Sequence, residues 1–480
     1  MGLSTNQKQG AAKSQTPNKG EPVIAIIDVG KTNKKLFLFD QHYNIVYERS
    51  ARFTETVDED GDPCENLESL RLSVFDSMHD VFTKKEYDVK AVNFSTYGAS
   101  FVYIDEAGRP VAPLYNYLKP YPEELKKQFY DTYGGEDDFS YQTASPVLGN
   151  LNSGMQLYRI KYQKPELFQK IKYALHLPQY MSYLISGNVC SDITSIGCHT
   201  NLWNFIKNDY HEWVYREGIS NKLAPILSCD HVNPAAFPGS DYCVGVGLHD
   251  SSAALIPYQV NFLEPFVLIS TGTWCISLNP FNDTPLTFDE LRNDCLCYMH
   301  YRGGPVKASR FFGGNEHEEQ VKRIADHFNQ NMLAYRTMEF EPSIITRLQD
   351  KTAPGTAANR GSLLMKESIF AQRNLDDFAD DTEAYHQLIL DIVHQQKAST
   401  ALVLKDTPVK RLFVDGGFSK NAIYMNLLAR MFPQMEVFAA SMAQATAVGT
   451  ALSIHQAWNK NPFPNNLIEL KYYSVAGVSM

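Results

Sequence analysis

The sequence has no apolar run of the roughly 20 residues that a transmembrane helix needs. Residues 1–21 are polar, rich in Gln, Lys, Asn and Ser, and lack the apolar core of a secretory signal. We interpret this segment as a disordered N-terminal tail. We therefore expect a cytoplasmic protein without a membrane partner.

Closely spaced cysteines and excess positive charge are also lacking. Eight cysteines are scattered over 480 residues, which is typical of reduced thiols in a cytoplasm. Cys295 and Cys297 form the one close pair, and without a second pair they do not predict a zinc site. The net charge of −10 disfavours nucleic acid as a partner. It leaves room for a small anion bound locally by backbone amides and a few cations.

The sequence further lacks a Walker A loop, although Gly30-Lys31-Thr32 looks like the end of one. That loop needs a glycine five residues before Gly30 and a helix after Thr32. Ala25 occupies the first position, and Leu36–Asp40 follows with a strand pattern. We predict instead a hairpin of two strands, Val23–Asp28 and Leu36–Asp40, joined by a polar turn.

The chain is too long for one compact core, so two or more domains are expected. An apolar strand followed by a Gly/Thr turn occurs twice, at Asp28–Thr32 and at Ser270–Thr273. We predict an α/β fold of two domains that meet near residue 260, with ligands bound where the turns converge. The expected boundaries are 22–258 for the N-terminal domain, 262–460 for the C-terminal domain and 461–480 for a C-terminal extension.

The first hairpin has the chemistry of a phosphate site. Gly30 lets backbone amides approach an anion, Thr32 and Asn33 add side-chain donors, and Lys31 adds charge. Asp28, at the strand end, is suited to orient Mg²⁺ through water. The alternative is an ordinary surface hairpin, with Lys31 facing solvent.

Two further glycine turns repeat this pattern. Thr271-Gly272-Thr273 lies between two strand-like runs and predicts a second phosphate cradle. Asp415–Asn421 follows a strand and opens a helix, so its Gly416-Gly417 backbone and the helix N-terminus suit a nucleotide. It lacks the dinucleotide fingerprint. The alternative for each segment is a turn without a ligand.

Asp250 follows the flexible Gly245-Val246-Gly247 segment and precedes an Ala-rich helix start. The functional hypothesis is a general base that accepts a hydroxyl proton as the hydroxyl attacks phosphorus. The alternative is a helix cap. His249 is suited to bind the same hydroxylated substrate.

Taken together, these segments resemble the FGGY carbohydrate kinases of the actin-like ATPase superfamily, from Val23 to about Ala457. The matching motifs are Asp28-x-Gly30, Gly247-x-His249-Asp250, Ser270-Thr271-Gly272-Thr273, Gly416-Gly417-x-Ser419-Lys420-Asn421 and Ala447-x-Gly449. Within the family the chain looks most similar to the rhamnulokinase branch, with fuculokinases as close neighbours. "STYGASFVYIDEAGRPVAPLYNY", "LPQYMSYLISG", "HDSSAA" and "STGTW" carry that similarity.

The resemblance implies two actin-like, ribonuclease H-like domains with a catalytic cleft between them. It implies MgATP-dependent phosphorylation of a sugar hydroxyl, by a monomer or homodimer, with a ketose such as L-rhamnulose or L-fuculose as acceptor. Carried over position by position, it implies Asp250 as base and Asp28 as the acid that places Mg²⁺. The implied ATP-binding residues are Gly30, Lys31, Thr32, Asn33, Thr271, Gly272, Thr273, Gly416, Gly417, Ser419 and Asn421. The implied sugar-binding residues are Tyr97, Gly98, His249 and Asp250.

The sequence departs from the family at three places. Lys31 replaces a small or hydroxyl residue, and Gln444 replaces an acid near the last helix. "YNYLKP", Tyr115–Pro120, replaces an acidic and basic pair that often contacts sugar, which leaves the substrate open. Xylulose, ribulose or a polyol are alternative acceptors. A non-catalytic binding protein and a chaperone-type or actin-type ATPase are the rival functions on this fold.

Overall fold

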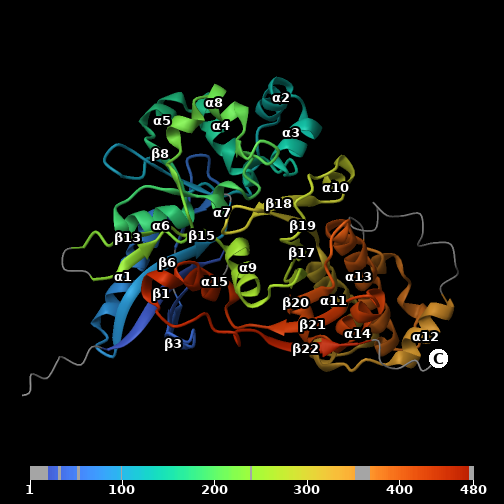
Figure 1. The fold of residues 1–480 in the computed structure, drawn as a ribbon. Coiled ribbons are helices and arrows are strands. Elements are labelled where there is room, and N and C mark those ends of the chain that lie inside the picture. Colours follow the sequence, from blue (N-terminus) through green and yellow to red (C-terminus); the bar gives the residue numbers. More distant parts are fainter. Residues whose placement is uncertain are drawn as a thin grey trace, which may run out of the picture.

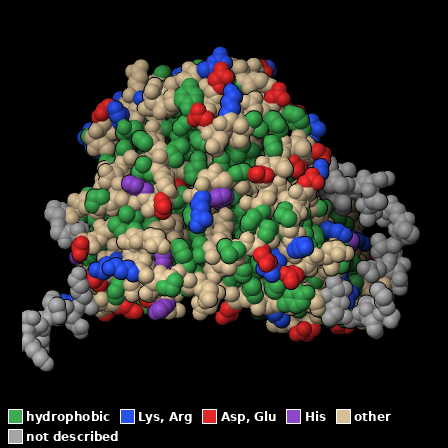
Figure 2. All heavy atoms as spheres, viewed as in Figure 1, with side chains coloured by type: hydrophobic (Ala, Val, Ile, Leu, Met, Phe, Trp, Pro, Cys, Tyr) green, Lys and Arg blue, Asp and Glu red, His purple; other side chains and the backbone are tan. Residues whose placement is uncertain are grey.

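The computed structural model describes residues 20–30, 34–50, 54–98, 100–237, 241–351 and 368–474. Two lobes, each built on one large β-sheet, lie side by side with helices between them (Figure 1). Among these residues, no helix has both the length and the apolar character needed to span a bilayer. On the face shown in Figure 2, acidic and basic side chains are interspersed rather than gathered in one broad patch.

The first sheet has seven strands within the described residues, in the order β13-β14-β6-β1-β2-β3, with β15 also paired to β6. β1 pairs antiparallel with β2 and parallel with β6. The strands are β1 (Glu21–Val29), β2 (Lys34–Phe39), β3 (Ile45–Ser50), β6 (Tyr87–Thr96), β13 (Val232–Pro234), β14 (Cys243–Gly245) and β15 (Leu248–His249).

The second sheet, also seven-stranded within the described residues, has the order β18-β19-β17-β16-β20-β21-β22. β16 pairs antiparallel with β17 and parallel with β20, so it repeats the arrangement around β1. The strands are β16 (Phe266–Thr271), β17 (Cys275–Asn279), β18 (Cys295–Met299), β19 (Pro305–Phe311), β20 (Arg411–Gly416), β21 (Glu436–Ser441) and β22 (Glu469–Tyr473). This repeated topology confirms the predicted two-domain α/β fold.

Both faces of each sheet are covered, which explains why the central strands are nearly continuous apolar runs. In β1, Val23, Ala25 and Ile27 pack toward the side of α1 (Leu67–Thr83) and α6 (Leu177–Ser186). Ile24 and Ile26 point to the opposite face, toward α9 (Asp250–Asn261) and α15 (Ala445–Ser453). The second sheet packs on α11 (Gly313–Phe328), α13 (Asp381–Leu404) and α14 (Ala422–Met431).

A helix-rich region with its own apolar core lies above the first sheet in Figure 1. It is anchored by β7 (Phe101–Ile104) and β8 (Tyr173–His176), which pair antiparallel. Its helices are α2 (Glu123–Thr132), α3 (Glu136–Thr143), α4 (Ser153–Gln163), α5 (Pro165–Lys170), α7 (Ile193–Ile196) and α8 (Glu212–Arg216). The remaining short elements are β4 (Glu55–Val57), β5 (Pro63–Glu65), β9 (Ser191–Asp192), β10 (Trp203–Asn204), β11 (Asp209–Tyr210), β12 (Ile226–Leu227), α10 (Phe288–Arg292), α12 (Pro342–Lys351) and α16 (His455–Trp458).

Helix α9 is shared by the two lobes. Its Ala253 and Ile256 pack against the first sheet, whereas Leu255 and Tyr258 pack in the core that lines the second sheet. Helix α15 crosses α9 closely, because a Cβ on Gly449 would stand 1.9 Å from the carbonyl oxygen of Ala253. The lobes are therefore joined by two helices in tight contact.

The expected C-terminal extension, 461–480, contains the strand β22. β22 pairs antiparallel with β21 and forms the edge of the second sheet. Pairing supplies hydrogen bonds to a strand edge that would otherwise be open. Helix α15, although it follows the second sheet in sequence, packs on the first sheet. The expected domain boundary at residue 460 stays a prediction. The predicted tail, 1–21, lies outside the described residues up to residue 19.

Candidate active site

Two carboxylates lie at the carboxyl ends of β1 and β15, the two strands that pair in parallel with β6 in the first sheet. Asp28, near the end of β1, is aligned with Ser95 of β6. Leu248 of β15 is aligned with the same Ser95, and β15 leads directly into Asp250, the first residue of α9. Carboxyl ends of parallel strands are where open α/β sheets bind ligands.

Asp28 is half-buried and accepts a hydrogen bond of 2.7 Å from the Ser95 hydroxyl. Burial raises the pKa of this carboxyl to about 6; the charge of Asp250 adds to the rise, whereas the Ser95 bond opposes it. Two acids of the same sign are thus held near each other, an arrangement that a bound cation would relieve.

The residues around Asp28 suit a magnesium ion that takes most of its ligands from water and substrate phosphates. No group of three or more acidic, His or Cys side chains suited to a metal occurs among the described residues. Mg²⁺ commonly takes one or two carboxylates and completes its shell with water and substrate phosphates. Asp28 supplies such a carboxylate. Gly30 ends the described part of this hairpin, and the predicted contacts of Lys31, Thr32 and Asn33 lie outside the described residues.

Asp250 offers one free carboxylate oxygen. Its side chain is 32% exposed, and its Oδ1 accepts the backbone N–H of Ser251 at 2.6 Å and lies 3.3 Å from His249 Nε2. Its Oδ2 has no hydrogen-bond partner among the described residues. The residue that caps α9 is His249 rather than Asp250. A partly exposed carboxylate with one oxygen free of hydrogen bonds is available to accept a proton.

Gly98 and His249 are in direct contact. A Cβ at Gly98 would stand 2.9 Å from the His249 ring, so only glycine fits against it. Burial lowers the pKa of His249 and keeps its ring neutral. The ring also packs 5.7 Å from the Tyr298 ring, which comes from β18 of the second sheet. The predicted sugar-side residues therefore adjoin a residue of the other lobe.

Two residues near this point were missed as site residues by sequence reasoning. Burial raises the pKa of Tyr117, and the charges of Asp250 and Glu65 add to the rise, so its hydroxyl lies near both carboxylates. Tyr97 is buried, and its hydroxyl forms a hydrogen bond with Glu65. No local motif marks Glu65, because the fold brings it to Tyr97 from a separate strand.

The second glycine turn and the Gly-Gly turn pack against each other. Thr271 is aligned with Gly416 across β16 and β20. Gly416 has φ = 87°, and a Cβ there would stand 2.0 Å from the Thr271 carbonyl oxygen. Gly314 lies at the start of α11, and a Cβ there would stand 1.8 Å from the Gly272 carbonyl oxygen. Bare backbone therefore lines this region, as a phosphate cradle requires.

A cavity of about 730 Å³ opens beside these turns, and we call it the C-terminal cavity. Its lining includes the predicted Thr271, Gly272, Thr273, Gly417 and Asn421. Further lining residues, which the sequence did not predict, are Gly314, His317, Glu318, Val321, Met332, Leu333, Tyr335, Arg336, Tyr385, Phe418 and Lys420. Apolar and aromatic side chains next to glycine turns suit a flat ring joined to phosphates.

The polar groups of this cavity are tied together internally. Asn421 caps α14 and donates to the Tyr385 hydroxyl at 2.8 Å, which lies 3.0 Å from His317 Nε2. Burial lowers the pKa of His317 to about 4, so the ring is neutral when it shares this hydrogen bond with the Tyr385 hydroxyl. Ser419 donates to the Gly416 carbonyl. Asn421 and Ser419 thus shape the cavity through contacts within the protein.

Helix α9 is hydrogen-bonded to the Gly-Gly turn region of the second sheet. Tyr258, near the C-terminal end of α9, donates to Asp415 Oδ2 at 3.1 Å. Asp415 immediately precedes the Gly416-Gly417 turn, and Asp250 begins the same α9. The helix that carries Asp250 is therefore attached at its other end to the turn that shapes the C-terminal cavity.

The sequence that forms these two parts of the candidate site matches one protein family along nearly its whole length. Residues 23–232 match the FGGY family of carbohydrate kinases, N-terminal domain. Residues 263–462 match the carbohydrate kinase FGGY, C-terminal domain. The chain belongs to the FGGY family of carbohydrate kinases.

Solved structures of carbohydrate kinases have the same fold. A carbohydrate kinase from Novosphingobium aromaticivorans is 21% identical, with a TM-score of 0.76 over 94% of this chain and 96% of that one. A ligand-bound xylulose kinase from Lactobacillus acidophilus is 15% identical, with a TM-score of 0.75 over 94% of both chains. A glycerol kinase from Plasmodium falciparum with ADP is 15% identical, with a TM-score of 0.69 over 91% and 90%.

As an FGGY kinase, the protein is a phosphotransferase that acts on a sugar hydroxyl, with ATP as the donor. The names of these neighbours include a xylulose and a glycerol kinase. The rhamnulokinase or fuculokinase branch therefore stays a prediction.

The departure at Tyr115–Pro120 has a structural counterpart in this FGGY kinase. Lys119 stands in that segment, and its ammonium lies 2.6 Å from Asp58, 2.7 Å from Asp60 and 2.9 Å from Asp62. The Lys119 side chain is only 4% exposed. Its charge is therefore used within the protein.

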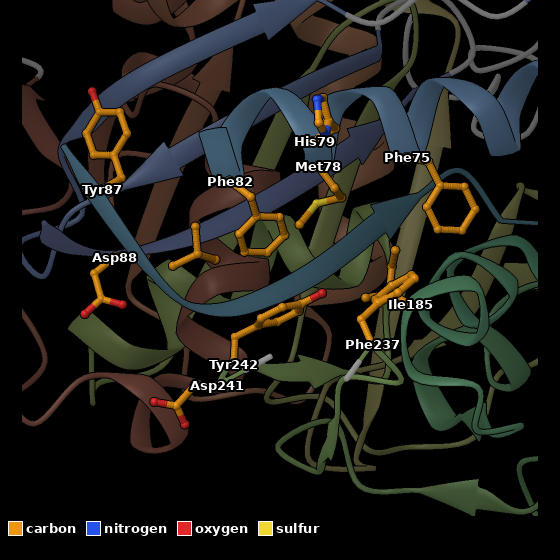
Figure 3. A pocket seen from close by; sticks show the side chains of 11 residues that line it. Phe75, Met78, His79, Phe82, Tyr87, Asp88, Ile185, Phe237, Asp241 and Tyr242 are labelled. Carbon is orange, nitrogen blue, oxygen red and sulfur yellow. The ribbon is translucent and has the colours of Figure 1, made fainter. Parts of the chain in front are cut away.

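A second cavity, of about 490 Å³, lies apart from the predicted site residues. Figure 3 shows its lining, with side chains from one stretch of α1 facing Phe237 and Tyr242. Phe75 contacts Phe237, and Phe82 contacts Tyr242. None of the predicted phosphate or sugar residues lines it, so we assign it no part in the reaction of this kinase.

Proposed function

We propose that this FGGY kinase transfers the γ-phosphoryl group of MgATP to a hydroxyl of a ketose. The observation that carries the proposal is the placement of Asp28 and Asp250 at the carboxyl ends of β1 and β15, with the C-terminal cavity tied to the same helix α9. A nucleotide in that cavity would direct its phosphates along the glycine turns toward the first sheet.

The proposed step is an in-line displacement at phosphorus. A lone pair of the sugar oxygen forms the new O–P bond, and the bond from the γ-phosphorus to the bridging oxygen breaks. The bonding electrons leave with ADP, and the hydroxyl proton passes to Asp250 Oδ2. Neutral His249, beside Asp250, helps to hold the sugar.

Asp28 would hold Mg²⁺ near the phosphates, through water. When bound, Mg²⁺ supplies positive charge that neutralises phosphate oxygens as negative charge moves onto ADP. Asp28 then keeps the charge it needs for this contact, because a neighbouring cation favours the ionised carboxylate.

The acceptor is proposed on residue similarity. The rhamnulokinase-like segments favour a deoxyketose such as L-rhamnulose or L-fuculose. The hydrogen-bonding groups near Asp250, namely Tyr97, Tyr117 and Glu65, suit hydroxyl groups. Xylulose, ribulose and polyols remain the alternatives. The eight cysteines, all among the described residues, form no disulfides, which supports a cytoplasmic location for the enzyme.

A coupled ADP-release assay with MgATP and a panel of ketoses and polyols tests the proposal. We expect one sugar to stimulate release and Asp250→Asn to lower that turnover at least 100-fold, because proton transfer by such a group contributes about 10²–10⁴-fold. ATP affinity, measured by titration calorimetry, should stay within about threefold. The matched control is Asp283→Asn, at an exposed acid away from the site, which should keep wild-type turnover.

Two results would redirect the proposal. ADP release that no sugar stimulates, with ATP still bound, would favour a non-catalytic binding protein. Release that proceeds equally without any sugar would favour an ATPase. Near-normal turnover of Asp250→Asn would remove Asp250 from the role of base.

A further inference from the structure

A guanidinium group, that of Arg310, lies beside the phosphate turn of the second sheet. Arg310 belongs to β19, which pairs with β17, the strand that leaves the phosphate turn Thr271–Thr273. Its guanidinium stands 5.2 Å from the centre of the Trp274 ring, and Trp274 directly follows that turn. One side of Arg310 is thus fixed beside the phosphate cradle of the second sheet.

The other side of Arg310 reaches the residues around Asp250. Burial is the main influence on the pKa of Tyr298 and on the pKa of His199. The positive charge of Arg310 also acts on both and lowers each pKa. Tyr298 packs on the His249 ring at 5.7 Å, and Asp250 also acts on Tyr298. β19, which carries Arg310, pairs with β18, which carries Tyr298, so neighbouring strands bring Arg310 beside the phosphate turn and Tyr298 beside His249.

Arg310 is held in position but is not saturated. Its Nε and Nη2 donate to the two carboxylate oxygens of Asp294, at 2.9 and 3.2 Å. Its Nη1 has no hydrogen-bond partner among the described residues. The side chain is 13% exposed, so it is largely desolvated without being closed off. A fixed guanidinium with an unused N–H edge is suited to bind phosphate oxygens.

Charge around the site makes this group distinctive. The described carboxylates near the reacting atoms are Asp28, Asp250 and Glu65, which repel a phosphate. Among nearby described cations, Lys34 pairs with Glu65 and Lys119 is enclosed by three aspartates. Lys420 and Arg336 line the C-terminal cavity, and Arg310 is the cation of β19 that lies beside the phosphate turn.

We infer that Arg310 binds the phosphoryl group as it moves from ATP to the sugar, with Asp294 and Trp274 as positioning residues. The inference rests on the proposed function and adds a catalytic residue from the C-terminal lobe. In that transfer the γ-phosphorus loses its bond to the ADP oxygen and gains one to the sugar oxygen. Arg310 stabilises the negative charge on the oxygens that stay on phosphorus, and it neither gains nor loses a proton.

The test compares Arg310→Met and Arg310→Lys with wild type, using the sugar of the panel with the highest rate. We expect Arg310→Met to lower kcat at least 100-fold, with KM for the sugar changed less than about threefold. Arg310→Lys should retain an intermediate kcat, because lysine keeps the positive charge but lacks the planar pair of N–H donors of a guanidinium group. The matched control is Arg302→Met, at an exposed arginine in the β18–β19 turn.

Binding of nucleotide analogues gives a readout independent of turnover. With sugar present, Arg310→Met should bind MgADP within about threefold of wild type but bind MgADP–aluminium fluoride at least 30-fold more weakly. Asp294→Asn should weaken the fluoride complex by a smaller factor, because Arg310 is then less well held.

The outcomes separate the two proposals. If wild type shows no sugar-stimulated turnover, the proposed function fails. If wild type turns over and Arg310→Met stays within about fivefold, or weakens both analogues equally, the inference about Arg310 is wrong. Should Arg310→Met fail to fold, Arg310→Lys decides: equal losses of both analogues refute the inference, and a selective loss of the fluoride complex supports it.

Discussion

Asp28 illustrates how a single residue trades stability for binding. Its pKa lies about 2 units above the ordinary value of 3.8, so the folded protein holds this proton more tightly than the unfolded chain. The stability from that proton is complete below about pH 4 and is lost as the pH rises through about 6. At neutral pH the ionised carboxylate therefore destabilises the ligand-free fold.

We expect Asp28→Asn to stabilise the ligand-free protein while it abolishes turnover. The amide carries no charge to bury, and its oxygen can still accept the Ser95 hydrogen bond. Urea unfolding in EDTA at pH 7.5 should show a gain of about 1–3 kcal/mol in the free energy of unfolding. The gain should shrink as the pH falls through 6 and approach zero only below the ordinary pKa of 3.8. A loss of stability at pH 7.5 would refute this account.

Lys119 carries a different prediction at the residue scale. Asp58 Oδ1 accepts the backbone N–H groups of Asp60 and Asp62, so the three carboxylates converge on the one ammonium. Lys119→Met leaves a buried Asp58 charge unpaired, and we expect a loss of about 3 kcal/mol in urea unfolding. Millimolar Ca²⁺, which takes oxygen ligands in flexible geometry, should recover part of that loss.

The same Ca²⁺ should leave wild type unchanged, because the ammonium already occupies the position. The matched control is Lys127→Met, an exposed lysine paired with Asp131, which should show no measurable change in stability. Lys119→Met with wild-type stability would show that the three aspartates do not need their cation.

At the scale of elements, the α9–α15 crossing fixes where Asp250 stands. Gly449 allows the backbones to touch, and any Cβ there meets the Ala253 carbonyl oxygen at 1.9 Å. Side chains of both helices fill the space over the first sheet, so the helices have little room to separate without opening a gap.

We expect Gly449→Ala to push the helices apart, with a loss of about 1–3 kcal/mol in stability and at least a tenfold drop in kcat. Differential scanning calorimetry and the ADP-release assay measure the two effects. Thr446→Ala, on the same helix, is the control and should change neither by much. An active, fully stable Gly449→Ala would mean that α9 tolerates displacement of its N-terminus.

For the whole molecule, buried histidines set the response to acid. Burial lowers the pKa of His211 from 6.5 to about 4, so the folded state keeps this ring neutral while the unfolded chain protonates it. Stability is complete above about pH 6.5 and falls as the pH drops toward 4. His176 behaves in the same way, with a pKa lowered by burial to about 3.

We expect His211→Asn to flatten the pH dependence of stability. Asparagine can replace the ring nitrogen that caps α8, so stability at pH 7.5 should change little. At pH 5 the variant should lose about 2 kcal/mol less than wild type, measured by urea unfolding at both pH values. Parallel pH curves for the two proteins would contradict this prediction.

Local patterns in the sequence were enough to predict the elements that carry the site. The predicted strand Val23–Asp28 lies within β1, and the predicted turn Asp415–Asn421 leads into α14. Such segments are specified by neighbouring residues and their periodicity.

The rest of the site depends on residues that are distant in sequence. Tyr258 meets Asp415 over a separation of 157 residues, and Tyr298 meets His249 across the two lobes. Neither contact has a local signal. In the sequence, nothing distinguishes Lys119 from an exposed surface lysine. Only the fold brings the 58–62 loop, with its carboxylates, around its ammonium group.

The return of α15 to the first sheet has a consequence for biosynthesis. Ile24, Ile26 and Phe37 are made early, yet Val448 and Leu452, which cover them, are made nearly last. While the chain is still on the ribosome, α9 can cover part of this apolar sheet face, but the part that α15 covers stays exposed until almost all of the protein has emerged. We therefore expect nascent chains that stop before residue 445 to recruit holding chaperones and to remain sensitive to protease, even where their β1–β6 pairing is complete.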